Sequence, residues 1–252
     1  MFGAWKDQVR RLAPEGLLRA IRFARANDPL LNLAERLALG RTAVDVGANE
    51  GLYTHRFARS AARVVAFEPI LWRAESLKTR YHHVQIEACA LSDHDGDMTL
   101  FVPVKEGRVI DTRASLEAEA NPGYSLVAQP TPVRRLDAWR LDDVAVIKID
   151  VEGHEAAVLA GARETILRNR PALVVEIEER HHPGRSSSIV DDLVANGYRA
   201  HYIEGGEVVG ADVIDFVRLQ PPALAKSPDG AFDSGYVNNF LFLPREGRTQ
   251  VL

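Results

Sequence analysis

The sequence predicts an α/β fold with a mainly parallel sheet covered by helices on both faces. From residue 42 onward, short apolar runs rich in β-branched residues alternate with helical segments. Strands that are joined by helices form parallel sheets, so this alternation indicates the fold class. A chain of 252 residues is also long enough to bury one large core without a metal or a disulfide.

Seven strands and four main helices follow from this alternation. The helix after residue 154 is the clearest, because Val158, Ala162 and Ile166 recur at four-residue spacing and Pro171 follows its end. Helices are expected over residues 51–60, 70–81, 154–169 and 186–196. Strands are expected over Thr42–Val46, Arg63–Glu68, Val84–Ala88, Val144–Asp150, Ala172–Ile177, Tyr198–Ile203 and Asn239–Leu243.

Two regions depart from the alternation. Asp97–Val102 predicts a short strand, whereas residues 104–132 form a long polar segment without periodicity, which is typical of a lid or a binding loop. The glycine pair at residues 205–206 predicts a hairpin after Ile203, and residues 205–236 are expected to be an irregular insertion. The final strand is then antiparallel to the rest of the sheet.

The first 40 residues are expected to form a helical extension, closed by Gly40, to a domain that spans residues 41–252. Residues 1–27 hold six basic and two acidic side chains, a net charge of +4 within an overall −4. Such a basic amphipathic helix docks on its own domain, binds a partner or lies on a membrane surface. Any weak membrane contact is therefore expected through residues 1–27.

The composition excludes several classes of protein. With 35 acidic and 31 basic side chains, the chain lacks the basic surplus of a nucleic-acid-binding domain, so no nucleic acid partner is expected. No run of about 18 apolar residues predicts a membrane span, and no secretory signal is expected. The lone Cys89 excludes an intramolecular disulfide and fits a cytoplasmic location. Homo-oligomerisation is left open.

The motif with the most chemical information ends the first strand and opens a helix. It includes Asp45, Gly47, Asn49 and Gly51, in the order Val44-Asp45-Val46-Gly47-Ala48-Asn49-Glu50-Gly51. The glycines allow a tight turn and close approach to a ligand. Glu68 ends the second strand, where a carboxylate accepts hydrogen bonds from a ribose diol. An adenosine-type cofactor is therefore expected at the carboxyl edge of the sheet.

The identity of that cofactor follows from the spacing of the glycines. A dinucleotide fingerprint is G-x-G-x-x-G, and its middle glycine admits a pyrophosphate. Asn49 occupies that position here, and the spacing is G-x-x-x-G. An asparagine can hydrogen-bond the carboxylate or amine of an amino acid, so S-adenosylmethionine is favoured over NAD.

An ordered set of motifs resembles the FkbM-like family of methyltransferases. Besides the glycine motif, the set comprises Ala66-Phe67-Glu68-Pro69, Ala90-Leu91-Ser92-Asp93, Leu136-Asp137, Ile147-Lys148-Ile149-Asp150-Val151-Glu152-Gly153-His154-Glu155 and Val158-Leu159-Ala160-Gly161-Ala162. The resemblance covers residues 42–180 and a closing strand at 238–244. It implies the class I methyltransferase Rossmann-like fold, with seven strands of which the last is antiparallel.

The resemblance also implies roles for individual residues. Asp45, Gly47, Asn49 and Gly51 would surround the methionine end of S-adenosylmethionine, and Glu68 would hold the ribose. The segment Ala90-Leu91-Ser92 would flank the adenine, and Asp150 would stand beside the transferred methyl group.

Three polar residues, Asp150, Glu152 and His154, follow a buried strand and are the candidate catalytic groups. The cofactor supplies the electrophile in methyl transfer, so the protein supplies alignment and removes the proton of the acceptor. His154 and Asp150 are both candidate bases, and Asp150 alternatively only orients the acceptor. Carboxylates in the first turn of a helix, such as Glu152, also occur without a catalytic role.

A second cluster of acidic and imidazole side chains follows the fifth strand at the same edge and comprises Glu176, Glu178, Glu179, His181 and His182. Of these residues, Glu176 and His181 are expected to face the substrate. Asp150, Glu178 and a histidine supply oxygen and nitrogen ligands suited to a divalent cation, but the spacing carries no metal signature, so metal-independent chemistry is preferred.

The favoured function is O-methylation of a hydroxyl on a sugar or another small-molecule or natural-product acceptor, where the resemblance points to oxygen. N-methylation of a peptide or amine stays open, and Asn49 disfavours a nicotinamide-dependent oxidoreductase. Acceptor contacts are expected from Arg113 to Tyr124, from Arg134 or Arg135, and from residues 205–236.

Overall fold

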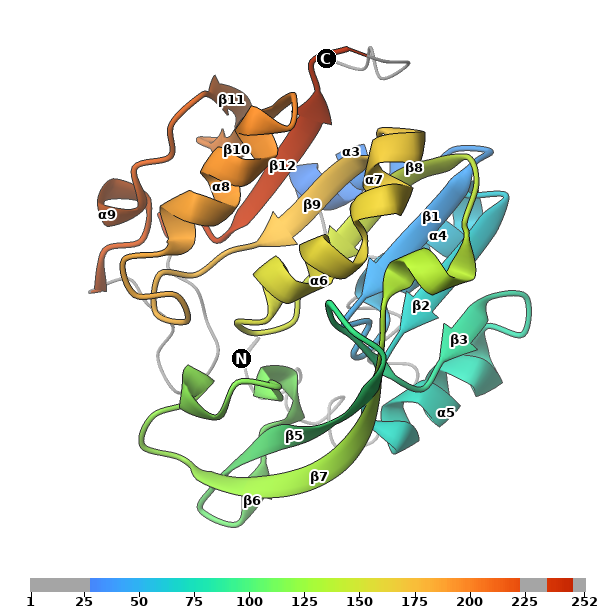
Figure 1. The fold of residues 1–252 in the computed structure, drawn as a ribbon, viewed down its shortest axis with the longest axis vertical. Helices are drawn as coiled ribbons and strands as arrows, with labels where there is room; N and C mark the ends of the chain where they lie inside the picture. The colour runs from blue at the N-terminus through green and yellow to red at the C-terminus, as the bar shows by residue number, and fades with distance from the viewer. Residues whose placement is uncertain (1–27, 223–234, 247–252) are drawn as a thin grey trace, which may run out of the picture.

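The computed structural model describes residues 28–222 and 235–246, which fold around one central sheet (Figure 1). Its strands are β1 (Thr42–Val46), β2 (Arg63–Phe67), β3 (Gln85–Glu87), β8 (Val144–Ile149), β9 (Ala172–Glu176), β10 (Tyr198–Glu204), β11 (Glu207–Ala211) and β12 (Asn239–Pro244). They lie in the order β11-β10-β12-β9-β8-β1-β2-β3. The five strands from β3 to β9 are parallel, whereas β12 is antiparallel to both β9 and β10. The predicted fold class is confirmed.

All seven predicted strands lie in this sheet, and a hairpin adds an eighth. The hairpin expected after Ile203 turns at Gly205 and Gly206, whose φ angles are 61° and 87°. Two positive φ angles in succession match a tight hairpin turn, which glycine adopts at little cost. The returning strand β11 pairs antiparallel with β10 and becomes the edge of the sheet.

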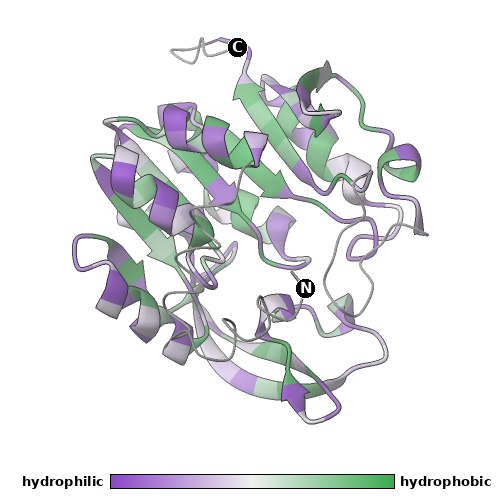
Figure 2. Ribbon diagram, turned by 180° about the vertical axis from the view of Figure 1, so that it is seen from behind, coloured by the Kyte–Doolittle hydropathy of each residue, from purple (hydrophilic) through white to green (hydrophobic). Residues whose placement is uncertain are grey.

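Helices cover both faces of the sheet (Figure 1). One layer contains α3 (Pro29–Leu37), α4 (Leu52–Ser60) and α5 (Leu71–Arg80), and the other contains α6 (Glu155–Gly161), α7 (Arg163–Asn169) and α8 (Ser186–Ala195). Alternate strand residues enter the two cores, so Val44 packs with the second layer and Ala43 with the first. Figure 2 shows the central strands as predominantly hydrophobic and the helices as mixed, which is the pattern of a sheet buried on both faces.

The helix predicted over residues 154–169 is divided in two at Ala162. The carboxylate of Asp137 accepts hydrogen bonds from the backbone N–H groups of Glu164 and Thr165, and from the Thr165 hydroxyl. These bonds cap a fresh helix start at α7. The periodicity alone could not show this break, because Asp137 comes from the 3₁₀ turn Leu136–Trp139, far away in the sequence.

Helix α3 is the described part of the expected N-terminal extension. It begins at an Asp28 cap, whose side chain accepts from the backbone N–H groups of Leu30 and Leu31, and it buries its apolar face against the sheet and α4. The helix ends at Leu37 with Ala38 as its cap, two residues before Gly40, which was expected to close it. Residues 1–27, with their predicted membrane contact, lie outside the described residues, and the domain boundary at residue 40 stays a prediction.

A second, four-stranded sheet replaces much of the predicted 104–132 loop. Its strands are β4 (Ala90–Leu91), β5 (Gly96–Lys105), β6 (Arg108–Val109) and β7 (Ser125–Arg134), in the order β4-β7-β5-β6. The long antiparallel pair β5 and β7 forms an arm beside the central sheet (Figure 1). The prediction of a structureless loop was wrong: residues 104–132 lack periodicity, yet β7 pairs with β5 along its length. Pro130 and Pro132 fit this strand because β4 pairs with β7 only at Val133 and Arg134, so that side of β7 is unpaired at the prolines.

The segment between the arm strands returns to the central sheet. It contains two 3₁₀ turns, η1 (Asp111–Arg113) and η2 (Ala118–Ala120), and we call residues 111–117 the roof segment.

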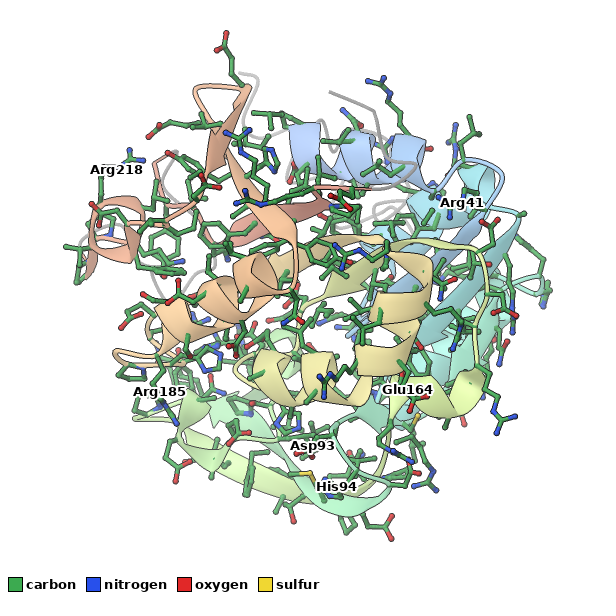
Figure 3. All side chains as sticks on the ribbon, turned by 45° about the horizontal axis from the view of Figure 1, so that its top comes forward. Arg41, Asp93, His94, Glu164, Arg185 and Arg218 are labelled. Atoms are coloured by element: carbon green, nitrogen blue, oxygen red, sulfur yellow. The ribbon has the colours of Figure 1, made fainter. Side chains whose placement is uncertain are left out.

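Charged side chains outside the site, such as Arg41, Glu164 and Arg218, lie at the periphery of the molecule (Figure 3). Across the described ranges, no helix combines the length and apolarity needed to cross a bilayer.

Candidate active site

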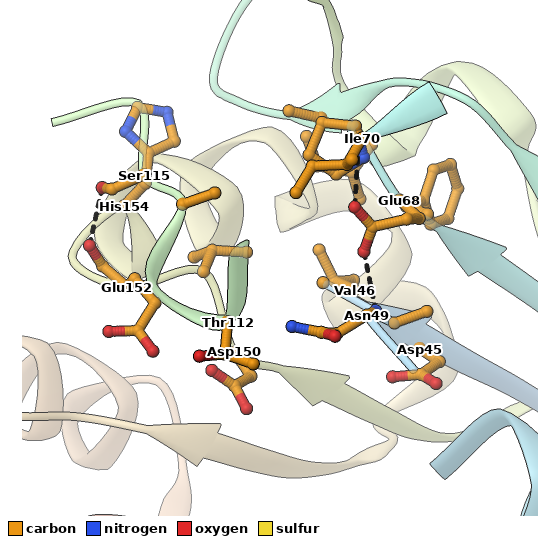
Figure 4. Close-up of a pocket in the computed structure, with 18 of the residues that line it drawn as sticks. Asp45, Val46, Asn49, Glu68, Ile70, Thr112, Ser115, Asp150, Glu152 and His154 are labelled. Atoms are coloured by element: carbon orange, nitrogen blue, oxygen red, sulfur yellow. Dashed lines mark hydrogen bonds between the residues drawn. The ribbon is translucent and has the colours of Figure 1, made fainter. Parts of the chain in front are cut away.

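A cavity of about 370 Å³ lies at the carboxyl ends of β1, β2, β8 and β9, beneath the roof segment (Figure 4). Its walls include ten of the residues predicted from sequence: Asp45, Gly47, Asn49, Glu68, Ala90, Leu91, Asp150, Glu152, His154 and Glu176. Three predicted residues, Gly51, Ser92 and His181, lie behind the wall instead. The carboxyl edge of a parallel sheet is where α/β folds bind their ligands, so the cavity has the position expected for a binding site.

The loop after β1 forms the floor of the cavity. Gly47 has a φ of 79°, and a Cβ atom there would lie 1.9 Å from the carbonyl oxygen of Asp150. Gly51 caps α4 with a φ of 88°, and a Cβ there would meet Leu77 at 2.5 Å. Both glycines are thus required by contacts within the protein. The side chain of Asn49 extends toward the site (Figure 4), and its buried Oδ1 atom has no hydrogen-bond partner within the described chain.

Glu68 is held rigidly at one end of the cavity. Its carboxylate accepts hydrogen bonds from the backbone N–H groups of Asn49 at 2.6 Å and Ile70 at 2.8 Å (Figure 4). Burial raises the pKa of Glu68 to about 7, against the lowering effect of these two bonds. Each carboxylate oxygen keeps a further lone pair, so Glu68 can still accept a bond from a ligand hydroxyl.

Asp45 lies deeper, on β1. It is 2% exposed and accepts a 2.6 Å hydrogen bond from the hydroxyl of Thr54 on α4. Burial raises its pKa to about 6, although Thr54 and the charge of Lys148 lower it. Asp45 therefore joins the cavity floor to α4.

The segment expected beside the adenine is only partly on the wall. Ala90 and Leu91 line the cavity together with Cys89, whereas Ser92 turns away and hydrogen-bonds His154. Burial raises the pKa of the Cys89 thiol to about 11, so the thiol is neutral and serves as a small apolar wall residue.

The opposite end of the cavity is rich in carboxyl groups. Asp150 follows β8, and its side chain is 36% exposed. Glu176 ends β9, where burial and then the charge of Asp150 raise its pKa well above the usual range, which favours the protonated form. The Nζ atom of Lys148 lies 3.6 Å from Asp150 Oδ2. Asp150 is thus the most accessible of these groups and has a cation beside it.

Glu152 is buried and already paired. Its carboxylate contacts Arg180 at 3.1 Å and His181 Nε2 at 3.4 Å. Burial lowers the pKa of His181 to about 4, so this histidine is neutral. It does not line the cavity. Oxygen atoms of Asp150, Glu152 and Glu176 lie within 4.8 Å of one another. Such a cluster has the size of a cation site, and Lys148 and Arg180 offset part of its negative charge. The preference for metal-independent chemistry stays a prediction.

Both ring nitrogens of His154 are engaged by the protein itself. Nε2 lies 2.9 Å from the hydroxyl of Ser92, and Nδ1 lies 2.6 Å from the carboxylate of Glu117 in the roof segment. The hydrogen bond from His154 lowers the pKa of Glu117. A general base must reach the proton that it removes, so this arrangement favours Asp150 over His154 for that role.

The sequence of the chain matches the model of the family described as "Methyltransferase FkbM domain" over residues 45–200. The chain belongs to the FkbM family of S-adenosylmethionine-dependent methyltransferases. The resemblance inferred from the ordered motifs is thereby confirmed.

Individual relatives are more distant. The chain is 25% identical over 182 residues to the 2-O-methyltransferase NoeI of Sinorhizobium fredii (strain NBRC 101917 / NGR234), which covers 66% of this chain and 74% of that protein. A solved FkbM methyltransferase from Methylobacillus flagellatus KT is 17% identical with a TM-score of 0.48, and the match covers 96% of this chain and 58% of the solved chain. An O-methyltransferase from Bacillus cereus, solved with SAH, is 14% identical with a TM-score of 0.45, and the match covers 95% of this chain and 96% of the solved chain.

Sequence reasoning missed several wall residues of this FkbM methyltransferase. The sequence did contain a signal for Lys148: a lysine within a predicted apolar strand indicates a buried cation with a partner, because lysine is seldom buried unpaired. Thr112, Ser115 and Leu116 in the roof segment gave no such signal. Of the expected acceptor contacts, Arg113 belongs to the roof segment but stacks on Tyr124 at 5.7 Å, and neither residue lines the cavity.

The two arginines expected to contact the acceptor lie elsewhere. Arg135 pairs with Asp95, and Arg134 bonds the backbone of Gly96 and lines a separate cavity with Cys89. Of the insertion, residues 223–234 lie outside the described part.

Proposed function

We propose that this FkbM methyltransferase transfers the methyl group of S-adenosylmethionine to a hydroxyl oxygen of a sugar or another small-molecule acceptor. The observation that carries the proposal is the division of one cavity into a hydrogen-bonding end at Glu68 and an acidic end at Asp150. The 2-O-methyltransferase name of the NoeI relative supports oxygen as the acceptor atom.

The residues at the floor of the cavity fit the cofactor. Among residues 28–222 and 235–246, the buried Oδ1 atom of Asn49 has no hydrogen-bond partner, and an unpaired buried acceptor is costly unless a ligand donor reaches it. An ammonium group of an amino acid is such a donor. Glu68 would hold the ribose hydroxyls, and Ala90 and Leu91 would flank the adenine. When bound, S-adenosylmethionine supplies an electrophilic methyl group.

The residues at the acidic end perform the remaining work. Asp150 accepts the proton of the acceptor hydroxyl, because it is the accessible carboxylate there and both nitrogens of His154 are occupied. The roof segment covers the cavity and limits the positions that an acceptor can take. Alignment of this kind lowers the barrier by holding the reacting groups in place.

Calorimetry tests the cofactor assignment. The wild-type protein is expected to bind S-adenosylhomocysteine and not NADH. Glu68→Ala is expected to weaken S-adenosylhomocysteine binding about tenfold or more, since a hydrogen bond to a charged group contributes about 1.5–3 kcal/mol. Binding of NADH without S-adenosylhomocysteine would refute the proposal.

Turnover with labelled S-adenosylmethionine and a library of hydroxylated sugars and amines tests the acceptor. Asp150→Asn is expected to keep wild-type affinity for S-adenosylhomocysteine and to lose about 10²–10⁴-fold in kcat, the usual contribution of a general base. Label that appears on amines and on no hydroxyl would replace the proposal with N-methylation.

A further inference from the structure

Lys148 is the buried cation of the site. It lies on the central strand β8, is 2% exposed and lines the cavity. Its Nζ atom donates hydrogen bonds to Asn239 Oδ1 at 2.9 Å and to the carbonyl oxygen of Ile149 at 3.2 Å. The ring of Tyr53 lies 5.4 Å away on the other side. An ammonium buried on an inner strand is unfavourable unless it is paired, so these partners explain how the fold tolerates it.

The register of the sheet gathers acidic groups around this lysine. Asp45 on β1 is directly opposite Lys148 in the parallel pairing of β1 and β8. Residues two apart share a face of the sheet, so Asp150 lies beside Lys148. On β9 the partner of Lys148 is Val174, which places Glu176 on the same face. The charge of Lys148 consequently lowers the pKa of both Asp45 and Glu176, against the raising effect of burial.

We propose that Lys148 is a positioning residue for methyl transfer, which holds Asp150 ionised and oriented toward the acceptor hydroxyl. The proposal rests on the proposed function, because it assigns Asp150 the proton of the acceptor. Lys148 itself is fixed by Asn239 and by the backbone, and its Nζ atom approaches Asp150 Oδ2 at 3.6 Å. An ammonium held in this way restrains the carboxylate and favours its charged form.

Glu176 also supports the ionised form of Asp150, because burial, the charge of Asp150 and a hydrogen bond with Asp150 all raise the pKa of Glu176 and favour a proton there that it can donate to Asp150. Glu152 is paired with Arg180. The titratable and charged groups that face Asp150 from the elements around it are Asp45, Tyr53, Lys148, Glu152 and Glu176. Lys148 is the cation in that set, so its removal takes away the positive charge next to Asp150, whereas Arg180 stays paired with Glu152.

The test compares neutral and charged replacements of this lysine. Lys148→Gln and Lys148→Met are expected to lower kcat about 10–100-fold and to move the acid limb of the kcat–pH profile upward by about one pH unit, the effect of losing a nearby opposite charge. Lys148→Arg keeps the charge and is expected to leave the limb in place. The KM for S-adenosylmethionine is expected to stay within about twofold, since the lysine acts through Asp150. Lys78→Met, at an exposed lysine on α5, is the matched control and keeps wild-type kcat.

Binding of S-adenosylhomocysteine to every variant reports whether the fold and cofactor site are intact. A neutral variant that binds it normally and keeps the wild-type acid limb would overturn the proposal. Loss of binding in all three Lys148 variants would also overturn it, because Lys148 would then be needed to build the site. The proposed function fails differently: the wild-type protein would then methylate no hydroxyl acceptor at any pH.

Discussion

Replacement of Gly47 by alanine tests whether the cavity floor is built by a contact between two strand ends. Gly47 follows β1, and a Cβ atom there would lie 1.9 Å from the carbonyl oxygen of Asp150. Real Cβ atoms essentially never come closer than 3.0 Å, so either the loop or the end of β8 must move by more than an ångström. Both carry site residues, namely Asn49 and Asp150, and the change therefore affects stability and function together.

Two other glycines separate the two effects expected at Gly47. Gly40 has a φ of 70° but open space around it, so Gly40→Ala tests the backbone conformation alone and is expected to destabilise by about 1–2 kcal/mol. Gly161 lies in α6, where an added Cβ would come within 1.9 Å of the Ser92 carbonyl oxygen, so Gly161→Ala tests overpacking alone, about 1–3 kcal/mol. Gly47→Ala combines both effects, about 2–5 kcal/mol in total.

Urea unfolding of the three variants gives the free energies of unfolding, and calorimetry gives the affinity for S-adenosylhomocysteine. Gly47→Ala is expected to be the least stable and to lose at least tenfold in affinity, whereas Gly40→Ala keeps wild-type affinity because Gly40 lies before β1 and away from the cavity. The reasoning is refuted if Gly47→Ala is no less stable than Gly40→Ala.

Three further predictions follow from the site. Glu68 and Asp45 are each expected to contribute a loss of stability as the pH rises from about 4.5 to about 7, because burial raises the folded-state pKa of Glu68 to about 7 and of Asp45 to about 6, and protons bound more tightly in the folded state are lost in that window. His181, whose pKa burial lowers to about 4, contributes the opposite slope, so the Glu68 contribution is read from the difference between the wild type and Glu68→Gln. Thermal unfolding in a pH series measures this, and a slope in Glu68→Gln equal to that of the wild type would contradict the assignment. Arg73→Met removes the 2.6 Å contact with Asp111 of the roof segment and is expected to speed S-adenosylhomocysteine dissociation several-fold in stopped-flow experiments; an unchanged rate would show that this contact does not hold the roof. His154→Asn is expected to lower kcat less than Asp150→Asn does, and an equal or larger loss would restore His154 as the base.

The central sheet was predictable because its signals are local. Each parallel strand is a short apolar run, and each helix between strands shows its own period, so the seven strands follow from windows of a few residues. Of the arm, β5 was expected in part, as the short strand Asp97–Val102, but β7 was not predictable in this way. The outer half of β7 is exposed on both faces, and hence no burial-driven alternation marks residues 125–129 as a strand.

The cofactor end of the site was likewise easier to predict than the catalytic end. Asp45, Asn49 and Glu68 lie directly at strand ends, where the topology alone brings them together. The role of His154 depends on Ser92 and Glu117, which come from other parts of the sequence. An imidazole with a free nitrogen and one with both nitrogens bonded have the same sequence, and only the fold distinguishes them.

The roof segment explains why the two ends of the cavity are expected to respond together. On the cofactor side, Arg73 of α5 holds Asp111, and on the catalytic side the Ser115 hydroxyl donates to the carbonyl oxygen of Glu152 at 2.7 Å. A movement that opens the roof over one end therefore strains the contact at the other. Because the segment returns from the arm rather than from the central sheet, its sequence can change without altering the strands that hold Glu68 and Asp150. Acceptor choice can then vary while the cofactor floor stays the same, which is the separation expected when function resides in loops on a fixed scaffold.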